Sequence, residues 1–257
     1  MISVKDVWKR YGKLEVLKGL SLDIFDGETL VILGRSGVGK SVLLKQIIGL
    51  EMPDKGSIEI DGVKVTDLSY RAVRPGLKRM GMLFQGSALF DSLDVGENVA
   101  YYLREHPSDI SESEIQDRVE NALNMVGLSG IQKKLPSELS GGMRKRAALA
   151  RLIVYRPEII LYDEPTTGLD PITSMQINDL INQTKETLNA TSVVVTHDIT
   201  SAFKVGNRLA FHSDGKIVQV ASPSDFLHID DPVLHEFFQN AIIDKSRIEN
   251  YKNGKGS

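Results

Sequence analysis

The sequence predicts an α/β fold: a mixed, mostly parallel sheet covered by helices, with an N-terminal antiparallel β-subdomain and an inserted α-helical subdomain. Near both ends of the chain, short β-rich segments alternate with helical segments, which favours parallel strands with helices on both faces. Between them, residues 87–155 change to the periodicity of amphipathic helices. Ligands of parallel sheets bind at the carboxyl ends of the strands, so functional residues are expected there.

The first part of the chain is predicted to be mainly β. Strands are predicted where apolar residues alternate with polar ones or form short continuous runs, at residues 2–7, 17–24, 29–33, 57–60 and 81–84. Asp-Gly pairs that begin at Asp26 and Asp61 mark turns between them. One helix is predicted among these strands, at residues 40–50. The helical insertion that follows is predicted to contain helices at residues 95–104, 112–126 and 142–155.

The last third returns to alternating strands and helices. Strands are predicted at residues 159–162, 192–196, 208–212 and 216–220, and helices at residues 172–188, 200–204 and 231–242. Residues 244–257 are too hydrophilic to pack, and the last ten are expected to be disordered. The expected organisation is one discontinuous core (residues 1–86 and 156–222), a helical subdomain (87–155) and a C-terminal extension (223–257).

The composition limits the class of protein. Of 257 residues, 41% are hydrophobic and 25% charged, which is typical of a globular protein with a full core. The net charge of -3 argues against nucleic acid as a partner, and the absence of cysteine excludes disulfides and thiolate metal sites. The start lacks the features of a signal peptide, and no apolar run approaches the roughly 18 residues of a membrane span. A cytoplasmic location is therefore expected.

A glycine-rich turn, residues 34–41, lies between a predicted strand and a predicted helix and fits the pattern G-x-x-x-x-G-K-[ST]. Glycines let successive amides point at a phosphate, Lys40 balances the charge of the phosphates, and Ser41 offers its hydroxyl to Mg²⁺. The predicted core is therefore that of a P-loop NTPase, RecA-like. The residues expected to bind nucleotide here are Gly34, Arg35, Ser36, Gly37, Val38, Gly39, Lys40, Ser41 and Val42.

Two acids, Asp163 and Glu164, end the apolar strand predicted at residues 159–162. By themselves, two acids at a strand end are more often a solvated turn, but a phosphate loop on the same sheet favours a functional role. Asp163 can hold Mg²⁺ through water, and Glu164 can orient and deprotonate an attacking water. A carboxylate base near phosphates indicates hydrolysis, because water is then the acceptor that needs activation.

Three further side chains are candidates for the same site. Gln85 and His197 follow the strands predicted at residues 81–84 and 192–196, so both can reach this sheet edge. Gln85 can bind Mg²⁺ or the attacking water, and His197 can hydrogen-bond the γ-phosphate; a satisfied polar residue at a strand end is an equally good interpretation of each. Tyr11 can stack on a base or pack against a turn. The other four histidines form no metal-spaced cluster and receive no role.

A second glycine turn, Ser140-Gly141-Gly142, opens the helix predicted at residues 142–155. Unpaired amides at a helix start and a serine hydroxyl can bind an anion, but alone the better interpretation is a capped helix whose residues 144–146 form a solvated basic face. The phosphate loop, however, lacks an evident arginine finger. A second copy, paired head to tail, can supply that charge from this turn.

In this order, the motifs resemble those of the ATP-binding cassette (ABC) ATPases, the motor subunits of membrane transporters, over residues 2–220. The resemblance implies ATP and Mg²⁺ as cofactors and ATP hydrolysis as the activity. It implies roles for the motif residues: adenine stacking by Tyr11, the Walker A loop at residues 34–41, the Q-loop at Gln85, the signature at residues 139–143, the Walker B acid Asp163, the catalytic base Glu164, the D-loop at Asp170 and the switch histidine His197. The catalytic residues are then Lys40, Gln85, Glu164 and His197, and the Mg²⁺ ligands Ser41, Gln85 and Asp163.

Met143 stands where this family most often has glutamine. Together with the runs at residues 83–93, 99–105 and 139–146, it resembles the ATPases of Mla/MCE-type lipid transporters. That subfamily implies a homodimer bound to an integral membrane permease at the inner face of the cytoplasmic membrane, an MCE-type lipid-binding partner, and movement of phospholipids between membranes. It also makes residues 231–242 a candidate dimer element, the alternative being a surface helix.

Three other functions remain open on the sequence. The chain can serve an importer of another substrate, such as an amino acid or a metal. It can be a non-transport ABC ATPase that acts on ribosomes or DNA, although no tandem cassette, coiled-coil insertion or basic arm is present. A P-loop kinase would leave residues 139–143 without a role.

Overall fold

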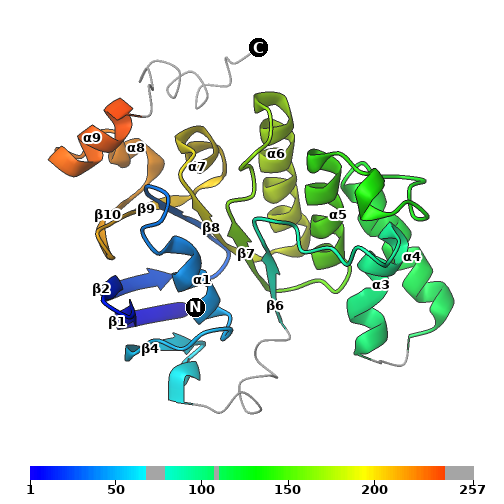
Figure 1. Cartoon of the computed structure of the whole chain (residues 1–257), viewed down its shortest axis with the longest axis horizontal. Coiled ribbons are helices and arrows are strands. Elements are labelled where there is room, and N and C mark those ends of the chain that lie inside the picture. The colour runs from blue at the N-terminus through cyan, green and yellow to red at the C-terminus, as the bar shows by residue number, and fades with distance from the viewer. Residues whose placement is uncertain (68–78, 107–109, 241–257) are drawn as a thin grey trace. The chain divides into compact units, whose positions relative to one another are not determined.

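The computed structural model describes residues 1–67, 79–106 and 110–240, which form two compact units (Figure 1). The terminal unit comprises Met1–Leu77 and Thr191–Ser257, and the central unit comprises Lys78–Ala190. These bounds differ from the predicted division at residues 86/87, 155/156 and 222/223, which stays a prediction.

The terminal unit begins with an antiparallel sheet of strands β1 (Ile2–Tyr11), β2 (Leu14–Ile24), β4 (Lys55–Ile60) and β5 (Val63–Lys64), in the order β2-β1-β4-β5. A short 3-10 helix, η1 (Val65–Asp67), follows β5. Strand β1 is longer than predicted, because bulges after Val4 shift its register instead of ending the pairing. Gly56 is required opposite the bulge, since a β-carbon there would lie 2.2 Å from the carbonyl oxygen of Asp6.

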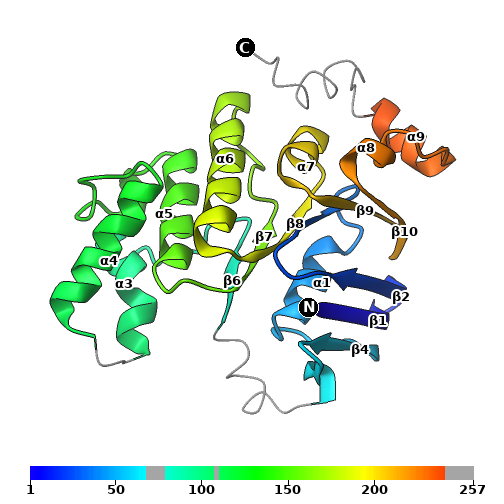
Figure 2. The same cartoon turned by 180° about the vertical axis from the view of Figure 1, so that it is seen from behind.

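The second set of strands in this unit is mixed and has the order β10-β9-β3-β8. Strand β3 (Thr29–Leu33) pairs in parallel with β8 (Thr191–Thr196) and β9 (Arg208–Ser213), and β10 (Lys216–Ala221) pairs antiparallel to β9. Every residue of β3 and β8 is buried. Helices α1 (Lys40–Ile47) and α7 (Ile199–Val205) lie on opposite sides of these strands (Figures 1 and 2). Burial on both faces explains the apolar runs at residues 30–33 of β3 and 193–195 of β8.

The described part of the terminal unit ends with helices α8 (Pro223–Phe226) and α9 (Pro232–Asn240). Leu234 and Phe237 of α9 are buried, and the Phe237 ring lies 5.3 Å from that of Phe211 in β9. Helix α9 thus packs on its own unit, as expected of a surface helix, and a role in dimerisation stays a prediction. The polar segment at residues 244–257, with its predicted disorder, lies outside the described residues.

In its described residues, 79–106 and 110–190, the central unit combines two parallel strands, β6 (Met80–Leu83) and β7 (Ile159–Asp163), with four helices. The helices are α3 (Val95–Glu105), α4 (Glu112–Met125), α5 (Gly141–Ile153) and α6 (Pro171–Leu188), and a 3-10 turn, η2 (Pro136–Glu138), precedes α5. Each of the four helices starts at a side chain that accepts a hydrogen bond from a backbone amide of its first turn: Asp94, Ser111, Ser140 and Asp170. Such caps fix where helices begin.

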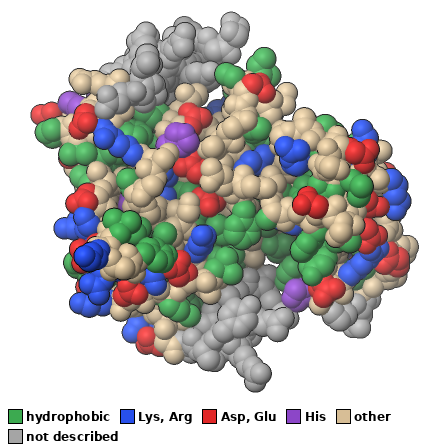
Figure 3. All heavy atoms as spheres, in the orientation of Figure 1, with side chains coloured by type: hydrophobic (Ala, Val, Ile, Leu, Met, Phe, Trp, Pro, Cys, Tyr) green, Lys and Arg blue, Asp and Glu red, His purple; other side chains and the backbone are tan. Residues whose placement is uncertain are grey.

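The surface and the helices carry two further observations. On the face shown in Figure 3, acidic and basic side chains are interspersed. Across residues 1–67, 79–106 and 110–240, no helix has both the length and the apolar character that a bilayer span requires.

Candidate active site

The phosphate loop of the terminal unit links β3 to α1 and leaves the start of that helix open to an anion. Gly37 and Gly39 have φ angles of 81° and 104°, which side chains disfavour, and Gly39 provides no side-chain cap for α1. The first turn of α1 contains no acidic residue, so its amides and positive end are suited to a phosphate. Lys40 is buried, and its Nζ donates to the carbonyl oxygens of Gly34 (2.8 Å) and Arg35 (2.9 Å). Its ammonium is therefore held at the loop, where it fits the charge of ATP phosphates.

The other residues of the loop differ in exposure. Arg35, Ser36 and Gly37 are exposed, whereas the side chains that follow them are half-buried: Val38, Ser41 and Val42. Arg35 donates to Glu236 of α9 at 2.7 Å, with more than half of each side chain exposed. An exposed pair of this kind contributes little to stability, but it connects the C-terminal helix with the phosphate loop.

A buried histidine, His212, lies against this loop, although its sequence context indicates no role. A β-carbon at Gly34 would lie 2.3 Å from the carbonyl oxygen of His212, so the loop can pass β9 only with glycine at this position. The His212 side chain is 1% exposed, and neither ring nitrogen has a hydrogen-bond partner. Burial, reinforced by the Lys40 cation, lowers the pKa of His212 to about 4. The ring is therefore neutral near pH 7.

His212 is expected to make the protein sensitive to mild acid. Its pKa is about 6.5 in the unfolded chain and about 4 in the fold, so between these values the unfolded state binds the extra proton. The contribution of the neutral His212 ring to the free energy of unfolding is fully present above pH 6.5. It falls as the pH drops towards 4, by roughly 2 kcal/mol at pH 5. In urea unfolding at pH 7.5 and pH 5, His212→Gln should lose less stability than the wild type, whereas the exposed His228→Gln should match it. An equal loss in the His212 variant would contradict the assignment.

His197 follows β8 in the same unit. Leu33 of β3 pairs with Thr196 of β8, and the Gly34 amide donates to the Thr196 carbonyl oxygen at 3.3 Å. The phosphate loop and His197 therefore leave neighbouring strand ends, as the sequence predicts, and the His197 side chain is exposed.

Tyr11, at the end of β1, presents an accessible ring, 46% exposed as a residue. Its hydroxyl donates to the carboxylate of Glu51, and the Lys9 Nζ lies 5.6 Å from the ring centroid. Burial of the hydroxyl and the neighbouring Glu51 raise the pKa of Tyr11 to about 12. The hydrogen bond to Glu51 thus fixes the hydroxyl end of the ring, while the ring itself stays accessible to solvent, which suits stacking on a base.

The strand ends of the central unit bring together the two acids and Gln85. Leu83 of β6 pairs in parallel with Tyr162 of β7, so Gln85, Asp163 and Glu164 leave the same edge within two residues of this pair. Asp163 and Glu164 are 6% and 7% exposed. Such shielding from water strengthens the interaction of a carboxylate with a nearby cation.

Glu164 has an unusual backbone conformation. Its φ angle of 47° is left-handed, which is uncommon for a residue other than glycine and marks stored strain. The turn after it is held by Thr167, whose hydroxyl donates to Glu164 Oε2 at 3.1 Å and whose amide donates to the Glu164 carbonyl oxygen at 3.3 Å. The carboxylate is therefore fixed at the strand end.

The signature turn starts α5 in the way its local sequence predicts. Ser140 caps the helix by accepting from the Met143 amide at 3.3 Å, and both Ser140 and Gly141 are exposed. Gly142 is buried. Only glycine fits at this position, because a β-carbon would lie 2.5 Å from Cγ2 of Thr173 in α6. Thr173 donates from its amide and its hydroxyl to Asp170, the cap of α6, so the signature turn and the Asp170 turn lie side by side at two helix starts.

The predicted solvated face at residues 144–146 is wrong at its middle residue. Lys145 is 4% exposed, and its Nζ donates to the carbonyl oxygen of Gln85. Burial lowers the pKa of Lys145, and the charges of Asp163 and Glu164 oppose that shift. The helical period of the sequence indicates this burial, because Lys145 lies four residues before Leu149, on the apolar face.

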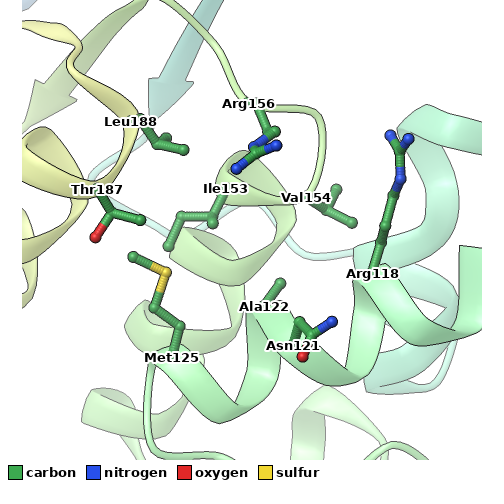
Figure 4. Close-up of a pocket in the computed structure, with 9 residues that line it drawn as sticks. All are labelled: Arg118, Asn121, Ala122, Met125, Ile153, Val154, Arg156, Thr187 and Leu188. Atoms are coloured by element: carbon green, nitrogen blue, oxygen red, sulfur yellow. The ribbon is translucent and has the colours of Figure 1, made fainter.

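A cavity of about 380 Å³ in the central unit is a separate feature (Figure 4). It lies between α4, α5 and α6, and Met125, Ile153 and Leu188 point into it. None of its lining residues is a predicted site residue, and its wall has no glycine loop or helix start for a phosphate. The cavity is therefore not the nucleotide site.

Comparison with known proteins agrees with these features. A family model described as ABC transporter matches residues 17–167. The chain is 42% identical to "Protein TRIGALACTOSYLDIACYLGLYCEROL 3, chloroplastic" of Arabidopsis thaliana, over 94% of this chain and 74% of the relative. It is 42% identical to "Probable ribonucleotide transport ATP-binding protein mkl" of Mycobacterium leprae, over 94% of this chain and 70% of the relative. It is 39% identical to "Intermembrane phospholipid transport system ATP-binding protein MlaF" of Haemophilus influenzae, over 93% of this chain and 90% of the relative.

Two solved structures of the cassette MJ0796 confirm the predicted fold class. A dimeric structure aligns with a TM-score of 0.81 and 35% identity, and a dimeric post-hydrolysis structure bound to ADP and Pi aligns with 0.80 and 34%. Both alignments cover 87% of this chain and 99% of the other. The chain therefore belongs to the ABC transporter family, as an ATPase that hydrolyses ATP with Mg²⁺.

Proposed function

We propose that this chain is the ATPase of a transporter that moves phospholipids between membranes, and that it works as a head-to-tail homodimer bound to a permease. The observation that carries the proposal is the similarity, over more than nine-tenths of the chain, to relatives whose names refer to intermembrane phospholipid transport and to a galactolipid. Met143 in the signature turn supports the same subfamily.

In this proposal the terminal unit binds the nucleotide. The amides at the start of α1 and the Lys40 ammonium bind the phosphates, and the Tyr11 ring stacks on adenine. Ser41, at the first turn of α1, holds Mg²⁺, which when bound neutralises charge on the β- and γ-phosphates. His197, on the strand end next to the loop, donates a hydrogen bond to the γ-phosphate.

The central unit then activates water. Asp163 and Gln85 would supply further oxygen ligands for Mg²⁺. Glu164 accepts a proton from the attacking water through a carboxylate that the Thr167 hydroxyl holds in place. Its burial keeps bulk water away from the one molecule that must react.

The second anion site belongs to a second copy. Ser140 and Gly141 are exposed at a helix start without acidic residues, so they can face the γ-phosphate bound by a partner. Head-to-tail pairing closes two such sites in one dimer. The solved MJ0796 cassette is dimeric, which supports this arrangement.

The dimer acts at the inner face of the cytoplasmic membrane as a peripheral subunit, held there by an integral permease. An MCE-type lipid-binding protein is the proposed third component. The chain itself does not contact the lipid, so the identity of the cargo lies with these partners.

Reconstitution tests the proposal. The chain and its co-purifying membrane proteins, placed in donor vesicles that contain a fluorescent phospholipid, should transfer that lipid to acceptor vesicles when Mg-ATP is supplied. Lys40→Ala should abolish the ATP-dependent part, because the phosphates lose their cation. Co-purification of an amino-acid or metal permease, or ATP-driven uptake of a ribonucleotide without lipid transfer, would overturn the lipid assignment. Ribonucleotide is the second candidate cargo, since the name of the Mycobacterium leprae relative refers to it.

A further inference from the structure

The segment that follows β6, residues 85–94, is here named the Gln85 loop, and its backbone is held in a costly conformation. Ser87 and Ala88 have φ angles of 66° and 49°, so two consecutive residues other than glycine are left-handed. Such a conformation persists only where surrounding contacts fix it. The contacts that do so come from two helices of the same unit.

Helix α5 supplies two cations to the carbonyl oxygens of this loop. Lys145 donates to Gln85, and Arg151 donates to Ala88 at 2.7 Å and to Ser87 at 3.0 Å. The Arg151 guanidinium also lies 5.9 Å from the centroid of the Phe90 ring. Charge-assisted hydrogen bonds are about twice as strong as neutral ones, so these contacts are suited to holding a strained turn.

Helix α3 holds the other end of the loop through one buried side chain. Asn98 accepts from the Phe90 amide at 2.8 Å and donates to the carbonyl oxygens of Phe90 (3.0 Å), Leu93 (2.9 Å) and Asp94 (3.0 Å). Helices α3 and α5 lie side by side (Figures 1 and 2). Asn98 thus holds residues 90–94 of the loop, whereas Lys145 and Arg151 of α5 hold residues 85–88.

Packing alone does not explain why a lysine is buried at position 145. An ammonium loses hydration when it is buried, and a methionine of similar length would fill the same space without that loss. Lys145 instead contacts the Gln85 carbonyl oxygen and lies within electrostatic range of Asp163 and Glu164. One side chain thus connects the helix that starts at the signature turn, the Gln85 loop and the two acids.

We propose that Lys145 and Arg151 form a two-cation clamp through which α5 fixes the Gln85 loop, and that Lys145 is a positioning residue for ATP hydrolysis. It acts through Gln85 and does not touch the nucleotide. This inference rests on the proposed function in taking Gln85 and Glu164 as parts of the hydrolytic site.

The test compares Lys145→Met with the wild type in ATP turnover and thermal unfolding. Methionine keeps the length and relieves the cost of a buried ammonium, which offsets the lost hydrogen bond to the Gln85 carbonyl oxygen, so the Tm should change little. The kcat should fall roughly 10- to 100-fold, since small misplacement of a catalytic group has effects of this size. The KM for Mg-ATP should change less than about twofold, because the phosphate loop is unaltered. Lys145→Arg, which restores a cationic donor, should recover kcat to within about threefold.

The control is Lys134→Met, which removes an exposed lysine of the same unit and should match the wild type. A wild-type kcat in Lys145→Met, or a fall in kcat explained by a lower Tm, would overturn the clamp. So would an Lys145→Arg variant as slow as Lys145→Met. If Lys145→Met does not fold, Lys145→Gln, a neutral side chain that still fits a polar site, takes its place under the same criteria.

Hydrogen exchange gives a local readout of the same clamp. The Ser87 amide donates to the carbonyl oxygen of Phe84 at 2.9 Å. In Lys145→Met this amide should exchange faster than in the wild type, whereas exchange of the β7 amides should be unchanged. Unchanged exchange at Ser87 would contradict the proposal. None of these assays needs lipid. A slow Lys145→Met together with failed phospholipid transfer would therefore reject the lipid function alone, and successful transfer together with a wild-type kcat in Lys145→Met would reject the clamp alone.

Discussion

Glu164→Gln is expected to stop ATP hydrolysis while leaving ATP binding in place. The amide has the shape of the carboxylate and keeps its position at the end of β7, but it cannot accept a proton from water. Loss of a general base lowers a hydrolysis rate by roughly 100- to 10,000-fold. Phosphate release at saturating Mg-ATP measures the loss, and equilibrium titration with ATP checks the retained affinity.

The same variant is expected to accumulate as an ATP-bound dimer, because both shared sites fill and neither empties by hydrolysis. Light scattering with and without Mg-ATP detects the change in mass. The matched control is Glu158→Gln, just before β7, whose side chain is 65% exposed and pairs with Arg79 at 3.0 Å. An exposed pair contributes little, so this control should hydrolyse ATP like the wild type. A wild-type rate in Glu164→Gln would show that another group is the base.

The buried strands could be predicted from the sequence because their environment leaves one pattern. Strand β3 was predicted with its observed bounds, Thr29–Leu33, since a short apolar run between Gly27 and Gly34 has no good alternative as a helix. The parallel pairings of β3 with β8 and of β6 with β7 then place the predicted site residues at strand ends. Helix starts were within one residue of the prediction where a cap was visible, as at Ser140.

Element ends were harder to predict because they depend on backbone conformation rather than pattern. Helix α1 was predicted to continue to residue 50, but it ends at Ile47, and Gly49 takes a left-handed conformation with a φ of 71°. Strand β1 was predicted to end at residue 7, where its alternation fails, yet bulges carry the pairing on to Tyr11. A bulge shifts the alternation of the side chains, so a strand that continues through it appears in the sequence to end there.

Motifs located the candidate site residues, whereas the residues that support them became visible only in three dimensions. Lys145 is a lysine in a basic run, and only the fold shows that its side chain is buried against the Gln85 carbonyl oxygen. His212 has no neighbour in the sequence that suggests a role, and its position against Gly34 follows from the pairing of β3 with β9. Side chains that act through backbone contacts leave no spacing pattern in a sequence.

Ser140→Asp separates the two roles of the signature serine. Aspartate caps a helix about as well as serine, so α5 should keep its start and the Tm should change little. Its carboxylate would face the γ-phosphate of the partner site, where loss of one donor alone costs about 100-fold. Hydrolysis by the homodimeric variant should therefore fall by at least that factor. A wild-type rate would show that the turn is only a helix cap.

Mixed dimers show which copy the turn serves. If it acts on the partner, a dimer of one Lys40→Ala chain with one Ser140→Asp chain places both defects in one site and leaves the other intact. Placing both changes in one chain, paired with a wild-type chain, instead damages both sites. Tandem-linked dimers in a single-turnover assay should then hydrolyse one ATP in the first arrangement and almost none in the second. If the turn served its own chain, the two results would be exchanged, because the first arrangement would damage both copies and the second would spare one.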